Sequence, residues 1–428
     1  MGKHKLFFKA GIFLLFMCVT SGGFSQALED KIFKPSVRTV LLHRTDGELT
    51  TPVINFNSEE RLLLSFDDLE GGYVAWQYTL VHCNADWTPT DLWQNEYLQG
   101  YTDDYITEYK NSFNTLQPYT HYSLELPNRN IEIRLPGNYI VKVYADGDPE
   151  HPAFIRRFMV VDKRVEVTAA ISQARNINQR YTHQDVSFSI LNPDYAISEP
   201  DRQLKVVILQ NFRWDNAMFN VKPLMLRSNE MDYHYTDGTL SFEAGNEFRF
   251  IDIKSLRYNT QNIYSIEQRN GQYYVNMMHD KSRAFSPYIT LSDINGNFLI
   301  KTEDAGDVDD EGEYAWVNIF LAWETPLAGG TFYAVGAYND WQHDKATEPE
   351  KGKMNYNYAR QGYEARLYLK QGYYNYYYAF VDDKTRKIDL SQAEGNRFET
   401  GNSYTILVYN REQGQLFDRL IAVQTVEN

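Results

Sequence analysis

Apolar and polar residues alternate with a period of two along most of the chain, which is the pattern of half-buried β-strands. In residues 74–83 this alternation places Trp76, Tyr78 and Leu80 on one face. Such runs are rich in β-branched and aromatic residues and are bounded by Gly, Pro, Asn or Asp. Further runs of this kind occupy residues 139–144, 154–161, 185–190, 204–209 and 317–323.

Tight-turn signals separate several of these runs. Asp237-Gly238, Asn270-Gly271 and Asn295-Gly296 each stand between two strand-like segments, and such pairs tolerate the positive φ of a two-residue hairpin turn. No segment shows a sustained apolar stripe at helical spacing. We therefore predict an all-β protein of tandem immunoglobulin-like, early-set β-sandwich domains that follow a signal peptide.

The N-terminal segment predicts export rather than a folded element. Residues 1–25 contain three lysines and no acid, followed by an apolar run at residues 10–19. That run is too short for a membrane span and suits a signal peptide. We expect cleavage after Ser25. A lipoprotein anchored at Cys18 is the alternative, but Met17 stands where a lipobox requires a small residue.

The strand-like runs fall into three groups, which predict three domains. We place a first sandwich at residues 26–162, a second at 163–302 and a third at 313–428. Residues 303–312 are expected to be an acidic linker, since mutual repulsion and a lack of apolar side chains favour a solvated segment.

That acidic segment also admits a calcium interpretation. Asp307, Asp309 and Asp310 could supply oxygen ligands, but their spacing does not match an EF-hand loop and no bidentate Glu follows at the required offset. We predict no metal site.

Composition and motifs argue against several classes of function. The chain has 428 residues and a net charge of -15, so nucleic acid is an unfavourable partner. Phosphate-binding loops, dinucleotide fingerprints, nucleophile elbows and zinc-protease motifs are all missing from the sequence. His82 and Cys83 are adjacent in a strand and point to opposite faces, so core packing is the better interpretation. We predict no enzyme, no catalytic residues and no cofactor.

The third domain contains a more specific pattern. Residues 330–341 end in Asn-Asp-Trp, and residues 363–380 contain a Lys-Gln-Gly turn and many tyrosines. This arrangement resembles early-set immunoglobulin-like domains and, among them, glycogen-binding modules, in which an exposed ring stacks on a sugar face. Trp341 would be that platform, and a core position is the alternative.

The tyrosine-rich strand adds a second candidate surface. Alternation sends Tyr374, Tyr376 and Tyr378 to one face and Tyr373 and Tyr377 to the other. We expect one set to face solvent or a partner, because amphipathic tyrosines suit interfaces. The candidate interaction or glycan platform is therefore Trp341, Tyr374, Tyr376 and Tyr378.

Five runs, in order along almost the whole chain, together resemble one family. They are YTLVHCNADW at 78–87, NTLQPYTHYSLELPN at 114–128, RRFMVVD at 156–162, LKVVILQNFRWDN at 204–216 and LKQGYYNY at 369–376. This set resembles the type IX secretion system plug protein family of the Bacteroidota.

The resemblance implies a non-enzymatic plug that closes the periplasmic end of the outer-membrane translocon barrel of that system. The protein would be periplasmic, at the inner face of the outer membrane and peripheral to it, with the barrel as its partner. The family implies no catalytic residues and no cofactor. A periplasmic or surface glycan-binding module, using the third domain, is the alternative function.

Overall fold

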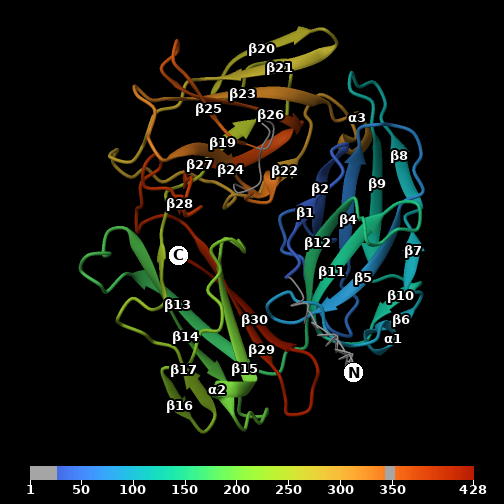
Figure 1. The fold of residues 1–428 in the computed structure, drawn as a ribbon, viewed down its shortest axis with the longest axis vertical. Coiled ribbons are helices and arrows are strands. Elements are labelled where there is room, and N and C mark those ends of the chain that lie inside the picture. Colours follow the sequence, from blue (N-terminus) through green and yellow to red (C-terminus); the bar gives the residue numbers. More distant parts are fainter. Residues whose placement is uncertain (1–26, 343–351) are drawn as a thin grey trace, which may run out of the picture.

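The chain folds into three β-sandwiches in contact with one another. The computed structural model describes residues 27–342 and 352–428, so the predicted signal peptide, residues 1–25 with cleavage after Ser25, lies outside the described residues. Strands make up nearly all the regular structure, which confirms the predicted fold class. Figure 1 shows the first sandwich at the right, the second at the lower left and the third at the upper left. None of the helices in the described ranges is long and apolar enough to cross a membrane.

The first sandwich pairs a sheet of order β1-β12-β11-β5-β7, with β3 beside β12, against a sheet of order β2-β4-β9-β8. The inward faces bury Phe66, Trp76 and Tyr122 among aliphatic side chains, as the period-two pattern predicts. Its elements are β1 (Lys31–Ile32), β2 (Val37–Arg44), β3 (Val53–Asn55), β4 (Leu62–Asp68), β5 (Gln77–Cys83), α1 (Gln94–Tyr97), β6 (Leu98–Gly100), β7 (Asp103–Tyr105), β8 (Glu108–Asn111), β9 (Thr120–Leu126), β10 (Ile131–Ile133), β11 (Gly137–Tyr144) and β12 (Phe154–Val161).

The second sandwich is discontinuous in sequence. One sheet has the order β13-β14-β17-β16, with β18 beside β14, and the other has the order β15-β29-β30. Its core joins Phe188 and Ile208 to Ile406 from near the C-terminus. Its elements are β13 (Glu166–Gln173), β14 (His183–Leu191), α2 (Pro200–Gln203), β15 (Leu204–Gln210), β16 (Met225–Arg227), β17 (Glu230–Asp232), β18 (Ser241–Glu243), β29 (Ser403–Asn410) and β30 (Arg419–Glu427).

The third sandwich is inserted between β18 and β29. A sheet of order β20-β21-β23-β26-β25 faces a layer in which β19, β22, β24 and β28 all pair with β27. Its elements are β19 (Arg249–Asp252), β20 (Ile263–Arg269), β21 (Gln272–Met277), β22 (Phe298–Ile300), α3 (Val308–Glu311), β23 (Tyr314–Ala322), β24 (Gly330–Val335), η1 (Ala337–Asn339), β25 (Asn355–Asn357), β26 (Gly362–Lys370), β27 (Gly372–Asp382) and β28 (Ile388–Asp389).

This insertion corrects the predicted domain division at 163–302 and 313–428. β15 pairs antiparallel with β29 over seven residues, from Leu204 opposite Asn410 to Gln210 opposite Tyr404. The C-terminal strands therefore complete the second sandwich rather than the third. The alternation within a strand specifies which face is buried but does not identify the strand that pairs with it.

The acidic segment at residues 303–312 is docked rather than solvated, which corrects the linker prediction. Lys110 Nζ of β8 lies 2.8 Å from a carboxylate oxygen of Asp307 and 3.2 Å from one of Asp309. The Phe113 amide donates to the carbonyl of Asp310 at 2.7 Å. Two of the three carboxylates considered above as calcium ligands, those of Asp307 and Asp309, therefore pair with the first sandwich. No group of three potential metal ligands occurs within the described ranges.

A separate hydrophobic cluster joins the first two sandwiches. Cys83, Trp87 and Met159 from the first sandwich pack against Leu209 and Tyr409 from the second. Cys83, Trp87, Met159 and Leu209 lie in three of the runs that carry the family resemblance, so those runs contribute to the contact between the domains. Burial of this kind fixes the first two sandwiches against each other, so that they do not move independently as domains on a flexible linker would.

Candidate functional site

The three predicted platform tyrosines lie in the core of the third sandwich, which makes the prediction of a surface site wrong for them. Tyr374, Tyr376 and Tyr378 are at most 2% exposed. The Tyr374 hydroxyl donates to the carbonyl of Lys370 at 2.6 Å, and the other two hydroxyls each donate to Asp280 Oδ2 at 2.8 Å. Burial raises the pKa of all three phenols well above the ordinary value.

The opposite face of the same strand is covered as well. Tyr377 is buried and its ring stacks on Phe248 with centroids 3.8 Å apart. Tyr373 is half-buried and stacks on Phe250 at 5.4 Å. Because β27 is a central strand with protein on both faces, neither tyrosine set is left for a partner.

Trp341 is half-buried and packs against the cluster that contains Phe248 and Tyr377. Its ring meets Phe248 edge to face at 5.9 Å, and the guanidinium of Arg213 lies 4.1 Å from the ring centroid. Trp341 also lines a cavity of about 750 Å³, to which Arg157 of the first sandwich and Trp214 of the second contribute. One face of the indole is thus already covered by a cation–π contact between sandwiches.

The environment of His82 and Cys83 does not favour proton transfer or nucleophilic attack by these side chains. Both side chains are fully buried. Burial lowers the pKa of His82 to about 4 and raises the pKa of Cys83 to about 12. A thiol that stays protonated is not a nucleophile at neutral pH.

A surface that sequence reasoning missed lies along one edge of the first sandwich. Six large aromatic side chains are exposed there, and we call this set the aromatic edge. Figure 1 shows β6, β7 and β8 along the outer margin of the first sandwich, with α3 of the third sandwich beside β8. The aromatic edge consists of Tyr73, Trp93, Tyr101, Tyr105, Tyr109 and Phe113.

Two edge strands of the first sandwich contribute to this surface, with Tyr105 on β7 and Tyr109 on β8. β7 ends one sheet and β8 ends the other, and the rings of Tyr73 and Tyr109 touch with centroids 5.0 Å apart. Acidic residues such as Asp103 and Glu108 interrupt the aromatic side chains, which protects exposed strand edges from aggregation. The surface is amphipathic and suits a reversible protein contact.

The sequence contained a signal for this edge. Aromatic residues recur every fourth position at Trp93, Tyr97, Tyr101, Tyr105 and Tyr109. That spacing is typical of a helix face, yet the segment forms a four-residue helix and short strands. Only Tyr97 is buried, so the regular spacing marks a surface and not a core stripe.

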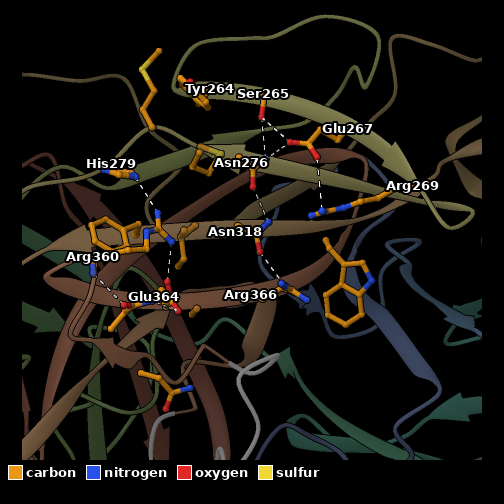
Figure 2. A pocket seen from close by; sticks show the side chains of 18 residues that line it. Tyr264, Ser265, Glu267, Arg269, Asn276, His279, Asn318, Arg360, Glu364 and Arg366 are labelled. Atoms are coloured by element: carbon orange, nitrogen blue, oxygen red, sulfur yellow. Dashed lines mark hydrogen bonds and ion pairs between the residues drawn. The ribbon is translucent and has the colours of Figure 1, made fainter.

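A second open surface is a groove of about 1190 Å³ on the third sandwich. It lies on the outward face of the sheet β20-β21-β23-β26-β25. Figure 2 shows Ser265, Asn276, Asn318 and Arg366 in a line across four strands, joined by hydrogen bonds. The groove holds polar and guanidinium groups in fixed positions.

Comparisons with known proteins identify relatives of this arrangement. Residues 37–162 match the family model described as the type 9 secretion system plug protein 1st domain. The crystal structure of a hypothetical protein from Parabacteroides merdae ATCC 43184 is 34% identical, with a TM-score of 0.89. That alignment covers 94% of this chain and 100% of the other, so the similarity includes all three sandwiches. A search of curated proteins finds no match.

Proposed function

The chain belongs to the type 9 secretion system plug protein family, and on that basis we propose that it closes the periplasmic end of the outer-membrane translocon barrel of that system. In this role it is an exported periplasmic protein at the inner face of the outer membrane, and the barrel is its partner. The family is a component of protein secretion, and the role requires no catalysis or cofactor.

The aromatic edge is the observation that carries this proposal. It lies within residues 37–162, the part of the chain that matches the plug family. A plug must bind its pore and also leave it, and a contact of amphipathic rings mixed with charges favours modest affinity over permanent association. Trp93 is the most exposed of the six rings, at 79%.

The rigidity of the chain supports the same role. A stopper works only if its parts do not move apart under load. The first and second sandwiches share the buried cluster around Cys83 and Tyr409, and the first and third share the fully buried ion pair of Asp67 and Lys370. Three sandwiches fixed in this way have the bulk that a wide pore requires.

The decisive experiment is a deletion paired with a pull-down. Deleting the gene should raise outer-membrane permeability to large antibiotics, and removing the barrel as well should restore the barrier. The tagged protein should co-purify with the barrel. Unchanged permeability in the single deletion, together with no barrel in the pull-down, would overturn the proposal.

The aromatic edge provides a sharper version of this test. Replacing Trp93, Tyr101 and Tyr105 together by Ser should abolish co-purification without unfolding the protein, because all three rings are exposed. The matched control replaces Ile177, Tyr181 and Tyr358 by Ser, which are equally exposed on the other sandwiches. The control variant should still co-purify with the barrel. Equal loss in both variants would show that this edge is not the contact.

The alternative of a glycan-binding module has no support at its predicted platform. Arg213 covers one face of the Trp341 ring and Phe248 meets its edge, and the three tyrosines are buried. We therefore advance no second function at that position.

A further inference from the structure

The outward face of one sheet in the third sandwich is divided into a covered part and an open part. At one end, Tyr314 donates a hydrogen bond to Asp67 of the first sandwich at 2.7 Å, and Tyr368 donates to Gln117 at 3.0 Å. Beyond Tyr368 the same face opens into the groove of about 1190 Å³. The groove therefore begins where the cover of the first sandwich ends.

The floor of the groove is a ladder of polar side chains that are in register across four strands. Ser265 stands opposite Asn276, Asn276 opposite Asn318, and Asn318 opposite Arg366. Each neighbouring pair is joined by a hydrogen bond of 2.9 Å, visible as dashed lines in Figure 2. A ladder that holds its side chains before a ligand arrives reduces the entropy lost on binding.

The row next to the ladder is aromatic. Tyr274, Trp316 and Tyr368 stand opposite one another on the same face, and the Trp316 and Tyr368 rings lie 4.5 Å apart. Trp316 is half-buried and lines the groove. An aromatic ring beside a row of amides matches a pyranose ring, which has an apolar C–H face and a hydroxyl-bearing rim.

The charges in the groove favour an anionic ligand. Glu364 neutralises Arg360 at 2.8 Å, and Glu267 lies 3.9 Å from Arg269. Arg366 forms no ion pair within the described ranges; its Nε donates to Asn318 Oδ1, and the side chain is exposed. A guanidinium with its outer N–H groups available binds a carboxylate through two parallel hydrogen bonds. This positive site belongs to a chain of net charge -15.

We propose that this groove binds an oligosaccharide that carries carboxylate groups, such as a chain of uronic acids. A sugar ring packs beside Trp316, its hydroxyls donate to the side-chain oxygens of Asn276 and Asn318, and its carboxylate pairs with Arg366. An extended peptide fits less well, because the backbones of the central strands β21, β23 and β26 are already paired on both sides.

The test measures binding by the purified full chain, so its outcome is independent of the plug role. The probe is a hexamer of α-1,4-linked galacturonic acid, and the same hexamer with its carboxyl groups reduced is the neutral comparison. Isothermal titration should give saturable binding of the acidic hexamer and weaker binding of the neutral one. The Arg366→Gln variant should weaken binding of the acidic hexamer about tenfold or more, which is the size of one lost charge-assisted hydrogen bond.

Two further variants separate the site from general electrostatics. Asn318→Ala should weaken binding of both hexamers, because it breaks the ladder at its centre. Arg202→Gln removes an exposed guanidinium from the second sandwich and should leave binding unchanged. The proposal is overturned if neither hexamer binds saturably at millimolar concentration, or if Arg366→Gln and Arg202→Gln have equal effects. It is also overturned if a barrel peptide occupies the groove in crosslinking and the hexamers do not compete.

Discussion

Asp67 of the first sandwich and Lys370 of the third form an ion pair 2.8 Å long, with side chains 0% and 1% exposed. His121 Nδ1 lies 2.7 Å from the other carboxylate oxygen of Asp67. Lys370 also donates to the carbonyl of Asp309 at 3.1 Å. Burial opposes ionisation of Asp67, but the Lys370 ammonium and the hydrogen bond with His121 outweigh it and lower the pKa of this carboxyl. The contact between two sandwiches thus depends on a charge that water does not reach.

Breaking this pair from one side should be costly. Asp67→Asn leaves the Lys370 ammonium buried without its counter-ion and should lower the free energy of unfolding by about 3–5 kcal/mol. The double variant Asp67→Asn with Lys370→Met removes both charges and should lose less than either single variant. Urea unfolding of the four proteins gives the coupling energy. Additive losses would mean that the two side chains do not depend on each other.

The protein should lose stability as the pH falls below about 6.5. An unfolded His82 binds its proton near pH 6.5, whereas the folded side chain binds it only near pH 4. The unfolded state therefore takes up more protons between these values, and stability falls by about 2 kcal/mol on reaching pH 5. His82→Gln should flatten the urea-unfolding profile between pH 5 and pH 7.

His151→Gln is the control for that experiment, since His151 is exposed. Its profile should follow that of the unsubstituted protein. If His82→Gln keeps the full slope, the acid sensitivity has another origin.

The acidic segment at residues 303–312 should resist proteolysis. Lys110 holds two of its carboxylates, so a protease specific for acidic residues should cut it slowly in the intact protein. Lys110→Ala should loosen the segment at Asp307 and Asp309 and speed the cut, whereas Lys163→Ala, outside this contact, should not. Mass spectrometry of the first fragments locates the site. Rapid cutting there in the unsubstituted protein would restore the interpretation as a solvated linker.

Two tryptophans should show opposite phenotypes. Trp341→Ala removes a half-buried ring that packs on Phe248 and Arg213, and it should cost about 2–4 kcal/mol. Trp93→Ala changes an exposed ring and should stay within about 0.5 kcal/mol while weakening co-purification with the barrel. Thermal unfolding compares the two. A stable Trp341→Ala protein would contradict the packed environment of that residue.

The sequence by itself determined the all-β class and the family. Alternation puts Trp76 and Tyr78 inside the first sandwich, as the structure shows, because a side chain in a strand has only two faces to choose from. The buried interpretation of His82 and Cys83 followed from the same rule. Five ordered runs were enough to indicate the plug family, and the match over residues 37–162 confirms it.

Only the tertiary structure decided which strands pair and which faces are covered. β15 and β29 are far apart in sequence, and their pairing makes the third sandwich an insertion. Tyr376 resembled a surface residue because the sequence of β27 alone does not show that other parts of the protein cover both faces of that strand. The acidic residues resembled a linker because repulsion among them is local, whereas Lys110, which pairs with Asp307 and Asp309, belongs to another sandwich. The amide ladder ending at Arg366 exists only after four strands align in register. Which side chains are buried and which charges pair depends on how the strands and sandwiches pack together. The local sequence pattern determines only which side chains share a face of each strand.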